Sequence, residues 1–287
     1  MNVASPGIGT SPRDMLHACV ADLHGATLDE CSTLPTSRFD SKFVAQVSAL
    51  GALVQTLHAS SSGGQSWRVL EVEHHRIVQY QTAYFDTPCL QLYRDHLQGR
   101  RRRFKIRTRR YSTGAHVLEI KLKGICGKTE KLRRTRANGA RRMVLDHAEH
   151  DWLLDSLQTQ FAYPAPLELS PSAQTFYRRI CLVGPDDDRL TIDLDFAVAQ
   201  GCNSPQGAAD QQIAVNPDLA IVESKSSRMR TDLDRQLRQI ARHPDQLSKY
   251  AIALAMTRGV RCNPWLPALR RLNGEPAADR HGMRGHV

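Results

Sequence analysis

The sequence predicts an α+β protein, mainly β, in which an antiparallel sheet closes into a barrel with a charged interior and helices packed outside. Many segments have the length and composition of strands and few have helical periodicity, which favours an antiparallel barrel or sandwich. Five of the strand-like segments alternate charged with apolar residues, so each has one charged and one apolar face. The basic residues are concentrated in the middle of the chain.

The net charge is distributed unevenly. The 287 residues include 39 Lys and Arg against 29 Asp and Glu, a formal charge of +10. Residues 100–142 hold 17 basic side chains and two acidic ones, so this segment has a charge of +15 and the rest of the chain −5. An apolar fraction of 41% and a mean hydropathy of −0.43 indicate a globular protein and exclude extensive disorder.

The N-terminal part of the chain combines helical and extended segments. Pro12 precedes a helix predicted over residues 13–24, because apolar side chains recur there at helical spacing. A strand is expected at 38–44 and a second helix at 44–58, where apolar residues again follow a period of 3.6. We expect residues 1–25 to form an N-terminal extension that is partly disordered around its short helix.

From residue 67 the pattern is mainly that of strands. They are predicted at 68–73, 76–84, 102–111, 116–123, 129–135, 175–183, 188–197 and 219–225. Helices are expected at 147–160, 231–242 and 247–257, the first two ending shortly before a proline. The folded domain then spans 26–257, and the Pro-, Gly- and Arg-rich residues 258–287 are expected to form a flexible basic tail.

Alternation along the strands places the charged residues on one side of the sheet. In the strand at 102–111, the face opposite Phe104 and Ile106 carries Arg103, Lys105, Arg107 and Arg109. The other charged faces comprise Arg38, Asp40 and Lys42; Glu119, Lys121 and Lys123; Arg189, Thr191, Asp193 and Asp195; and Glu223 and Lys225. Acids and bases are ordered along these faces, whereas a solvated sheet face more often carries Ser, Thr and Gln as well.

Two interpretations of these faces remain open. Each is either the solvated side of an antiparallel sheet or part of the interior of a closed barrel with helices outside. Repetition over five strands favours the barrel, and barrels of about eight strands hold a ligand. Arg and Lys supply hydrogen-bond donors that match phosphate oxygens, and carboxylates among them suit a divalent metal. A triphosphate or polyphosphate chain fits such an interior, whereas double-stranded nucleic acid does not.

Other motifs give no competing assignment. GICGKT at 124–129 has two residues between its glycines, where a phosphate-binding P-loop needs four. The arginine run at 100–103 lacks the aromatic interleaving of a nucleic-acid patch. Seven cysteines without a C-x-x-C pair, and histidines without ligand spacing, favour a reducing cytoplasm over disulfides or zinc. Neither a transmembrane segment nor a secretory signal is expected.

Eight segments carry a resemblance to a known family. They are RFDSKF (38–43), TAYFDTPCLQLYRDHLQGRRRRFKIRTRRY (82–111), LEIKLKG (118–124), TEKLR (129–133), TFYRR (175–179), RLTIDLDF (189–196), VESK (222–225) and LSKY (247–250). Together and in this order they resemble the polyphosphate polymerase (VTC) domain. That family belongs to the triphosphate tunnel metalloenzymes, which are related to the CYTH group of adenylate cyclases and thiamine triphosphatases. The resemblance runs from about residue 26 to 257.

The resemblance implies an antiparallel eight-stranded tunnel that makes inorganic polyphosphate from ATP, releases ADP and requires Mn²⁺ or Mg²⁺. Carried over by motif, the catalytic residues would be Lys42, Arg107, Arg109, Lys121, Lys131, Arg179, Arg189 and Lys249. Lys131, Arg179 and Lys249 rest on the resemblance alone, whereas alternation already places the other five inward. Glu223 would bind the metal, with Glu119 and Asp193 as further candidate ligands. The additional substrate-binding candidates are Arg38, Arg103, Lys105, Lys123, Arg133, Lys225 and Ser248.

One departure from the related triphosphatases bears on the reaction. Their first strand opens with Glu-x-Glu-x-Lys, whereas here it reads Arg38-x-Asp40-x-Lys42, with a base at the first acidic position. We therefore expect a polyphosphate polymerase whose ligands are ATP and polyphosphate, with no nucleic-acid partner. A tunnel-type triphosphatase or polyphosphatase and a non-catalytic polyphosphate-binding module remain alternatives. The sequence identifies no membrane-protein partner.

Overall fold

The computed structural model describes most of the chain. The described residues are 11–32, 39–60, 66–123, 129–137, 139–141, 143–163, 167–185, 188–200, 211–228, 231–241 and 243–275. Arg38 and the glycine-containing segment at 124–128 therefore lie outside the described residues.

Each predicted helix and strand corresponds to an element of the structure; the strands at 116–123 and 129–135 have the predicted boundaries, and the other elements begin or end at shifted positions. The strands are β1 (His24–Ala26), β2 (Phe39–Gln46), β3 (Arg68–Leu70), β4 (Ile77–Asp86), β5 (Arg103–Tyr111), β6 (His116–Lys123), β7 (Thr129–Thr135), β8 (Ser170–Val183), β9 (Arg189–Ala199), β10 (Gln212–Ala214) and β11 (Leu219–Ser226). The helices are α1 (Pro12–Ala21), α2 (Leu28–Ser32), α3 (Val47–Ala59), α4 (Gln91–Leu97), α5 (His147–Phe161), α6 (Asp232–Ala241), α7 (Lys249–Arg258), η2 (Asn263–Trp265) and α8 (Leu266–Leu272). β1, β10, α2, α4, η2 and α8 were not predicted.

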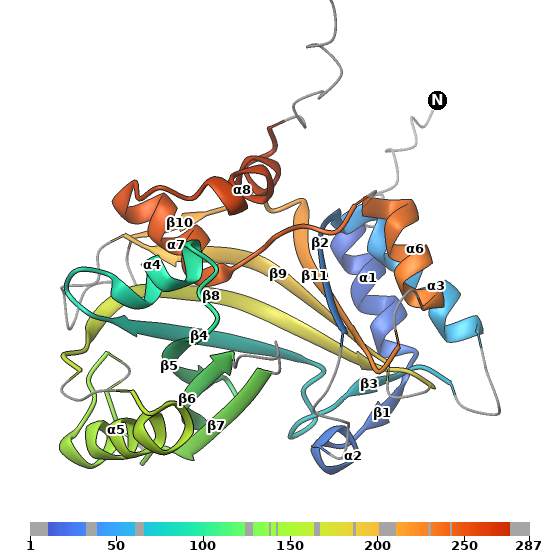
Figure 1. Cartoon of the computed structure of the whole chain (residues 1–287). Helices are drawn as coiled ribbons and strands as arrows, with labels where there is room; N and C mark the ends of the chain where they lie inside the picture. The colour runs from blue at the N-terminus through green and yellow to red at the C-terminus, as the bar shows by residue number, and fades with distance from the viewer. Residues whose placement is uncertain are drawn as a thin grey trace, which may run out of the picture.

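The strands form one sheet that is almost entirely antiparallel. Its main path runs β2-β11-β9-β8-β4-β5-β6-β7, and β1, β3 and β10 pair beside this path. The sheet curls, so that β5, β6 and β7 turn beneath the long strands β4, β8 and β9 (Figure 1). Within the described part of the chain no ladder joins β7 to β2. The expected closed barrel is therefore corrected to a curled sheet whose end strands, β2 and β7, are not paired with each other.

The free edge of β2 is bonded by a loop instead of by β7. The N–H group of Asp245 donates to the carbonyl oxygen of Lys42 at 2.6 Å, and the Asp245 carboxylate accepts from the N–H group of Val44 at 3.0 Å. Arg271 in α8 pairs with the same carboxylate. These bonds satisfy backbone groups of β2 that a closing strand would otherwise satisfy, which is the physical reason why the hydrogen-bonded cylinder stops here.

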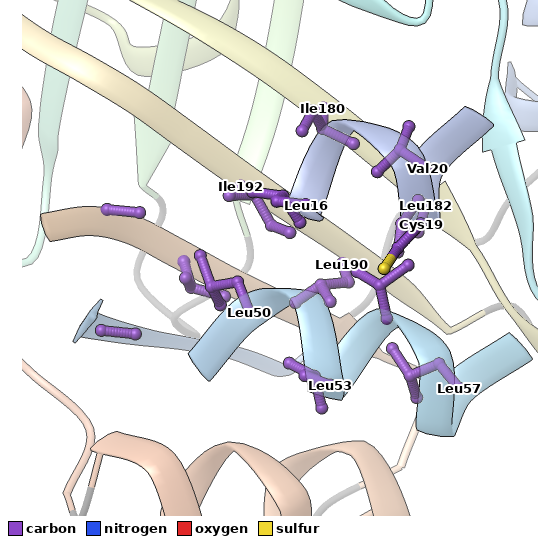
Figure 2. Packing of buried hydrophobic residues seen from close by; sticks show 14 of the residues in the cluster. Leu16, Cys19, Val20, Leu50, Leu53, Leu57, Ile180, Leu182, Leu190 and Ile192 are labelled. Atoms are coloured by element: carbon purple, nitrogen blue, oxygen red, sulfur yellow. The ribbon is translucent and has the colours of Figure 1, made fainter. Parts of the chain in front are cut away.

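Helices cover the convex side of the sheet, as predicted. Leu16, Cys19 and Val20 of α1 and Leu50, Leu53 and Leu57 of α3 pack on Ile180, Leu182, Leu190 and Ile192 of β8 and β9 (Figure 2). α6 adds Leu233 and Leu237 to this cluster. Under β5 and β6, α5 buries Leu153 and Leu157 against Ile106 and Ile120. The apolar faces of the alternating strands thus form the core beneath these helices.

α4, α7 and α8 cover one end of the concave side. Tyr250 of α7 stacks on Tyr84 of β4 with ring centroids 4.8 Å apart, and Tyr93 of α4 meets Tyr250 edge-on at 6.1 Å. The flexible tail expected from residue 258 is wrong for residues 263–272, which form η2 and α8. Their apolar side chains, among them Trp265 and Leu272, are buried against this aromatic cluster and so fix the segment.

The edge contacts of Asp245 lead to a stability prediction. Asp245→Ala removes the acceptor for the Val44 N–H group and the carboxylate that pairs with Arg271. The free energy of unfolding measured in urea should therefore fall by about 1–3 kcal/mol. Amide hydrogen exchange of Val44 should accelerate in parallel. As a control, Asp232→Ala breaks an exposed pair with Arg235 and should change the stability by less than about 0.5 kcal/mol. Equal losses in both variants would contradict this account of the β2 edge.

Candidate functional site

The charged side of the sheet is its concave side. Burial, together with nearby Lys42 and Arg107, lowers the pKa of Lys121 to about 8, while Glu223 acts in the opposite direction. Lys121 is in β6, whereas Lys42 and Glu223 are in β2 and β11 at the other end of the strand order. These side chains come near one another because the sheet curls around them. The charged interior predicted from alternation corresponds to this concave side.

Glu119 in β6 is the centre of the first group of charges. Its carboxylate is fully buried and lies 2.6 Å from Arg107 Nε, 3.6 Å from Arg109, 2.9 Å from Lys131 Nζ and 2.8 Å from Arg133 Nε. Burial raises the pKa of Glu119, but these cations outweigh it and hold the pKa well below its usual range. Both carboxylate oxygens are occupied by cations, so Glu119 is suited to orienting them rather than to binding a metal.

Asp193 in β9 organises a second group. Arg179 in β8 donates to both of its carboxylate oxygens, at 2.6 and 2.8 Å, and Lys249 Nζ lies 2.5 Å away. The pKa of Asp193 is lowered, because Arg179 and Lys249 together outweigh the effect of its complete burial. The bidentate geometry fixes the plane of the Arg179 guanidinium group and leaves its remaining donors for another anion.

Two tyrosines extend this group along the concave side. The Arg179 guanidinium lies 4.9 Å from the ring centroid of Tyr80, and the Arg109 guanidinium lies 5.2 Å from it. Lys249 Nζ is 4.9 Å from the centroid of Tyr177, which stacks on Tyr80. The ring faces stabilise buried cations without neutralising them. These tyrosines were not predicted as site residues, although alternation in β4 places Tyr80 on the same face as Thr82, which accepts a hydrogen bond from Arg109.

Glu223 in β11 is more accessible than Glu119 and Asp193. It pairs with Lys225 at 2.6 Å and loosely with Lys42 at 3.9 Å, and its side chain remains 13% exposed. Burial raises the pKa of Glu223, but Lys225 and Lys42 outweigh that effect and lower it strongly. Glu223 therefore stays ionised at neutral pH.

The third group consists of cations with little compensation. Burial and the neighbouring Lys121 and Lys42 lower the pKa of Lys105 well below its usual range, and its Nζ donates to Ser248 Oγ at 3.0 Å. Within the described part of the chain neither Lys105 nor Lys121 has a carboxylate at ion-pair distance. Ser248 caps the N-terminus of α7, so the positive end of this helix faces the same side chains.

His96 lies beside these lysines and was not predicted as a site residue. Its ring stacks on Trp265 with centroids 5.1 Å apart, and its pKa is lowered to about 2 by burial and by Lys105 and Arg103. His96 lies in α4, a short helix that the sequence pattern did not predict.

We define the basic cluster as the side chains that converge on the concave side. It contains ten cations and four carboxylates. The cations are Lys42, Lys105, Arg107, Arg109, Lys121, Lys131, Arg133, Arg179, Lys225 and Lys249, and the carboxylates are Asp40, Glu119, Asp193 and Glu223. Positive charge is thus in clear excess in a partly buried space, and it is suited to holding a polyanion.

Four predicted site residues lie at the margin of this cluster or outside the described residues. Arg189, at the start of β9 and opposite Lys225 of β11, donates to the carbonyl oxygen of Cys31 at 2.6 Å. Arg103 donates to the carbonyl oxygens of Gly99 and Arg100 in the loop before β5. Lys123 is exposed at the end of β6, and Arg38 lies outside the described residues.

One residue of the predicted charged face points the other way. Alternation predicted Asp195 beside Asp193, but its carboxylate contacts Arg178 and Arg13 of α1 on the convex side. Asp195 has a φ of 53°, and the β8–β9 register shifts beside it. The extra residue of this β-bulge turns Asp195 outward, which periodicity alone does not reveal.

The charged side chains do not form a complete metal cage. In the described ranges no group of three or more His, Cys, Asp or Glu residues is placed to hold a metal ion. Mg²⁺, however, is commonly held by one or two carboxylates together with substrate phosphates. A single ionised and partly accessible carboxylate, Glu223, fits that mode, in which the metal enters with its phosphate ligand.

Several solved structures match the chain at low sequence identity. A Hippeastrum protein described as a candidate adenylyl cyclase with dominant triphosphatase activity is 12% identical, with a TM-score of 0.49 over 77% of this chain and 97% of that one. A Pyrococcus horikoshii OT3 protein is 12% identical, with a TM-score of 0.44 over 78% and 99%. A candidate adenylate cyclase of Vibrio parahaemolyticus is 11% identical, with a TM-score of 0.41 over 73% and 94%. No curated protein matches.

Membership of a family follows from a sequence comparison. All three of these structures have TM-scores below 0.5. None of the described helices is long and apolar enough to cross a membrane. The family model of the VTC domain matches residues 37–258, which include every strand of the main sheet path. The chain belongs to the VTC domain family.

Proposed function

We propose that the chain is a polyphosphate polymerase, which transfers the γ-phosphate of ATP to a growing chain of inorganic polyphosphate. The observation that carries the proposal is the excess of cations in the basic cluster, above all at Lys42, Lys105 and Lys121. Buried like charges repel one another strongly unless a counter-charge is present. A polyphosphate chain supplies negative charge at every phosphate and is narrow enough to follow the concave side of the sheet.

The reaction needs positioning and charge neutralisation more than covalent help from the protein. A terminal oxygen of the bound chain attacks the γ-phosphorus in line, the bond from that phosphorus to the β–γ bridging oxygen breaks, and ADP leaves with the electron pair. Arg107 and Arg179 are held in fixed orientations by Glu119 and Asp193, so their free donors are pre-organised for charge that develops on the transferring phosphate.

The carboxylates of the cluster favour synthesis over hydrolysis. A general base for water works best when its pKa lies near the operating pH. The pKa values of Glu119, Asp193 and Glu223 are all lowered, so each is a poor base. A phosphate chain end is already anionic and needs no base. These three carboxylates are therefore unsuited to activating water, and a phosphate nucleophile does not need them to do so.

A divalent metal completes the proposed site. Mn²⁺ or Mg²⁺, bound to phosphate oxygens and to the Glu223 carboxylate, would supply charge neutralisation at the transferring group. Lys225 and Lys42 flank Glu223 and keep it ionised for this role. Glu119 and Asp193 act instead as anchors for arginines and lysines. The proposed ligands are ATP and polyphosphate, not nucleic acid, and the proposed location is the cytoplasm.

A product assay tests this function. Incubated with ATP and Mn²⁺, the full chain should form long polyphosphate that is resolved on a gel, with ADP released in equal amount. Glu223→Gln should lower the rate and raise the Mn²⁺ concentration needed for half-maximal activity, because the metal loses a protein ligand. Release of orthophosphate without chains would assign hydrolysis instead. Polyphosphate binding that survives chelation, with no turnover, would assign a binding module.

Two arginines of the same strand provide a matched test of the concave side. Arg107→Gln should reduce kcat by about 10²–10³-fold, since one pre-organised donor for the transferring phosphate is lost. Arg110→Gln removes an exposed guanidinium from the opposite face of β5 and should leave kcat within about twofold. Thermal unfolding of both variants controls for folding. Similar activity of the two would contradict the assignment of the concave side.

The lowered lysine pKa values predict proton uptake on binding. Burial lowers the pKa of Lys131 to about 7 and that of Lys121 to about 8. In the free protein at pH 8, a fraction of the molecules therefore has these two amines in the neutral form. A bound polyanion favours the charged forms and raises both pKa values, so protons are taken up on binding and the affinity falls as the pH rises through about 7 and about 8. Calorimetry with tripolyphosphate in two buffers of different ionisation enthalpy measures the uptake.

Lys131→Met provides the control for this experiment. It should remove part of the buffer-dependent heat at pH 7–8, because one of the two titrating amines is gone. Identical binding heats in both buffers for the unmodified protein would refute the coupling.

A further inference from the structure

The β-bulge in β9 sets which side chains face the basic cluster. Between the pairs Phe176–Ala197 and Arg178–Leu194, one residue of β8 opposes two residues of β9, Asp195 and Phe196. Asp195 adopts a left-handed conformation with a φ of 53°, which Asp tolerates better than most residues with a Cβ. The extra residue belongs to β9, and it reverses the inside–outside alternation from that point on.

The reversal serves both halves of the strand. Before the bulge, Asp193 faces the concave side and binds Arg179 and Lys249. After it, Phe196 faces the same side and packs with Tyr177 and α7, although it is three residues from Asp193. Regular alternation would place Asp195 inside and turn Phe196 outward. The bulge therefore allows one strand to supply both a charged anchor and an apolar contact for α7.

The displaced Asp195 is held on the convex side by two arginines. Its Oδ2 accepts from Arg178 Nε at 2.5 Å, and its Oδ1 pairs with Arg13 of α1. Arg13 also donates to the carbonyl oxygen of Pro217, in the turn before β11, at 2.5 Å. This outer clamp ties α1, β8, β9 and the start of β11 together at the bulge.

Two ion pairs consequently lie back to back across the β8–β9 ladder. On the convex side Arg178 binds Asp195, and on the concave side Arg179 binds Asp193. We propose that Asp195 is a positioning residue for the proposed phosphoryl-transfer site, because its clamped bulge fixes the Asp193 anchor that orients Arg179 and Lys249. This inference rests on the proposed function for its role in the reaction, while the positioning itself is independent of any ligand.

The first measurement needs no ligand. In the full-length protein, the Nε–H group of Arg179 is buried in its bond to Asp193 and should exchange slowly by NMR. Asp195→Asn keeps the tolerance for a left-handed backbone but removes the charge, and Arg13→Gln cuts only the outer tether. Both should accelerate exchange of the Arg179 Nε–H group, about tenfold for Asp195→Asn. Unchanged exchange in Asp195→Asn would overturn the inference, whatever the protein binds.

The second measurement concerns the ligand. Loss of an orienting outer partner typically costs about 10–100-fold in affinity or activity, so Asp195→Asn should weaken tripolyphosphate binding by about tenfold. The effect of Asp195→Asn on binding should be non-additive with that of Arg179→Gln, because Asp195 is proposed to act through Arg179. It should be additive with that of Lys121→Gln, because Lys121 does not contact the outer clamp. Additive effects with both would overturn the positioning role, since a general loss of stability weakens every contact alike.

A control and a separate outcome keep the two proposals distinct. Glu71→Gln breaks a pair of similar exposure with Arg76, which holds the C-terminal end of α1 instead of Asp195, and should change neither measurement. If Asp195→Asn accelerates Arg179 exchange while the unmodified protein fails to bind tripolyphosphate, the bulge positions Arg179 but the proposed function is wrong. If the unmodified protein binds and Asp195→Asn neither loosens Arg179 nor weakens binding, only this further inference is wrong.

Discussion

Burial of more cations than carboxylates on the inner side of a curled sheet is the constraint on which the structure depends. The repulsion among Lys42, Lys105 and Lys121 is an unfavourable interaction that the fold must overcome by other means. Apolar packing under the outer helices supplies that compensation. The same alternation that points charges inward points Ile106, Ile120 and their neighbours outward to these helices. Core and charged interior are therefore two faces of the same strands.

Glu119, Asp193 and Glu223 hold these cations in different ways. Glu119 and Asp193 are saturated by basic groups and fix guanidinium orientation, whereas Glu223 is more accessible and less fully paired. A fully neutralised interior would have no affinity for an anion, and an interior without carboxylates would leave long side chains unoriented. The observed ratio lies between these limits. It yields cations that are both oriented and under-compensated, which is what selective binding of a polyanion requires.

Sequence reasoning found what depends on local periodicity and missed what depends on tertiary contacts. Period-2 alternation predicted the strands and most of the inward cations, because a residue's face is set within its own strand. Closure was wrong because the partner of β2 is a loop carboxylate, Asp245, which no strand pattern reveals. Asp195 was misplaced because a bulge changes the phase of alternation. The helix at 266–272 was missed because its stability comes from burying Trp265 and Leu272 rather than from a strong helical pattern.

The excess charge also couples folding to ligand. At neutral pH the empty protein either releases protons from Lys121 and Lys131 or retains the repulsion among their charged forms, and both options cost free energy relative to the unfolded chain. A ligand that binds only the folded state stabilises it by about 2.7 kcal/mol at 100 times its Kd. A polyanion relieves the repulsion as well, since it is the missing counter-charge. The residues that would select the substrate are therefore the ones that destabilise the empty site, and burying an additional carboxylate there would relieve the repulsion only by reducing the affinity that the excess charge provides.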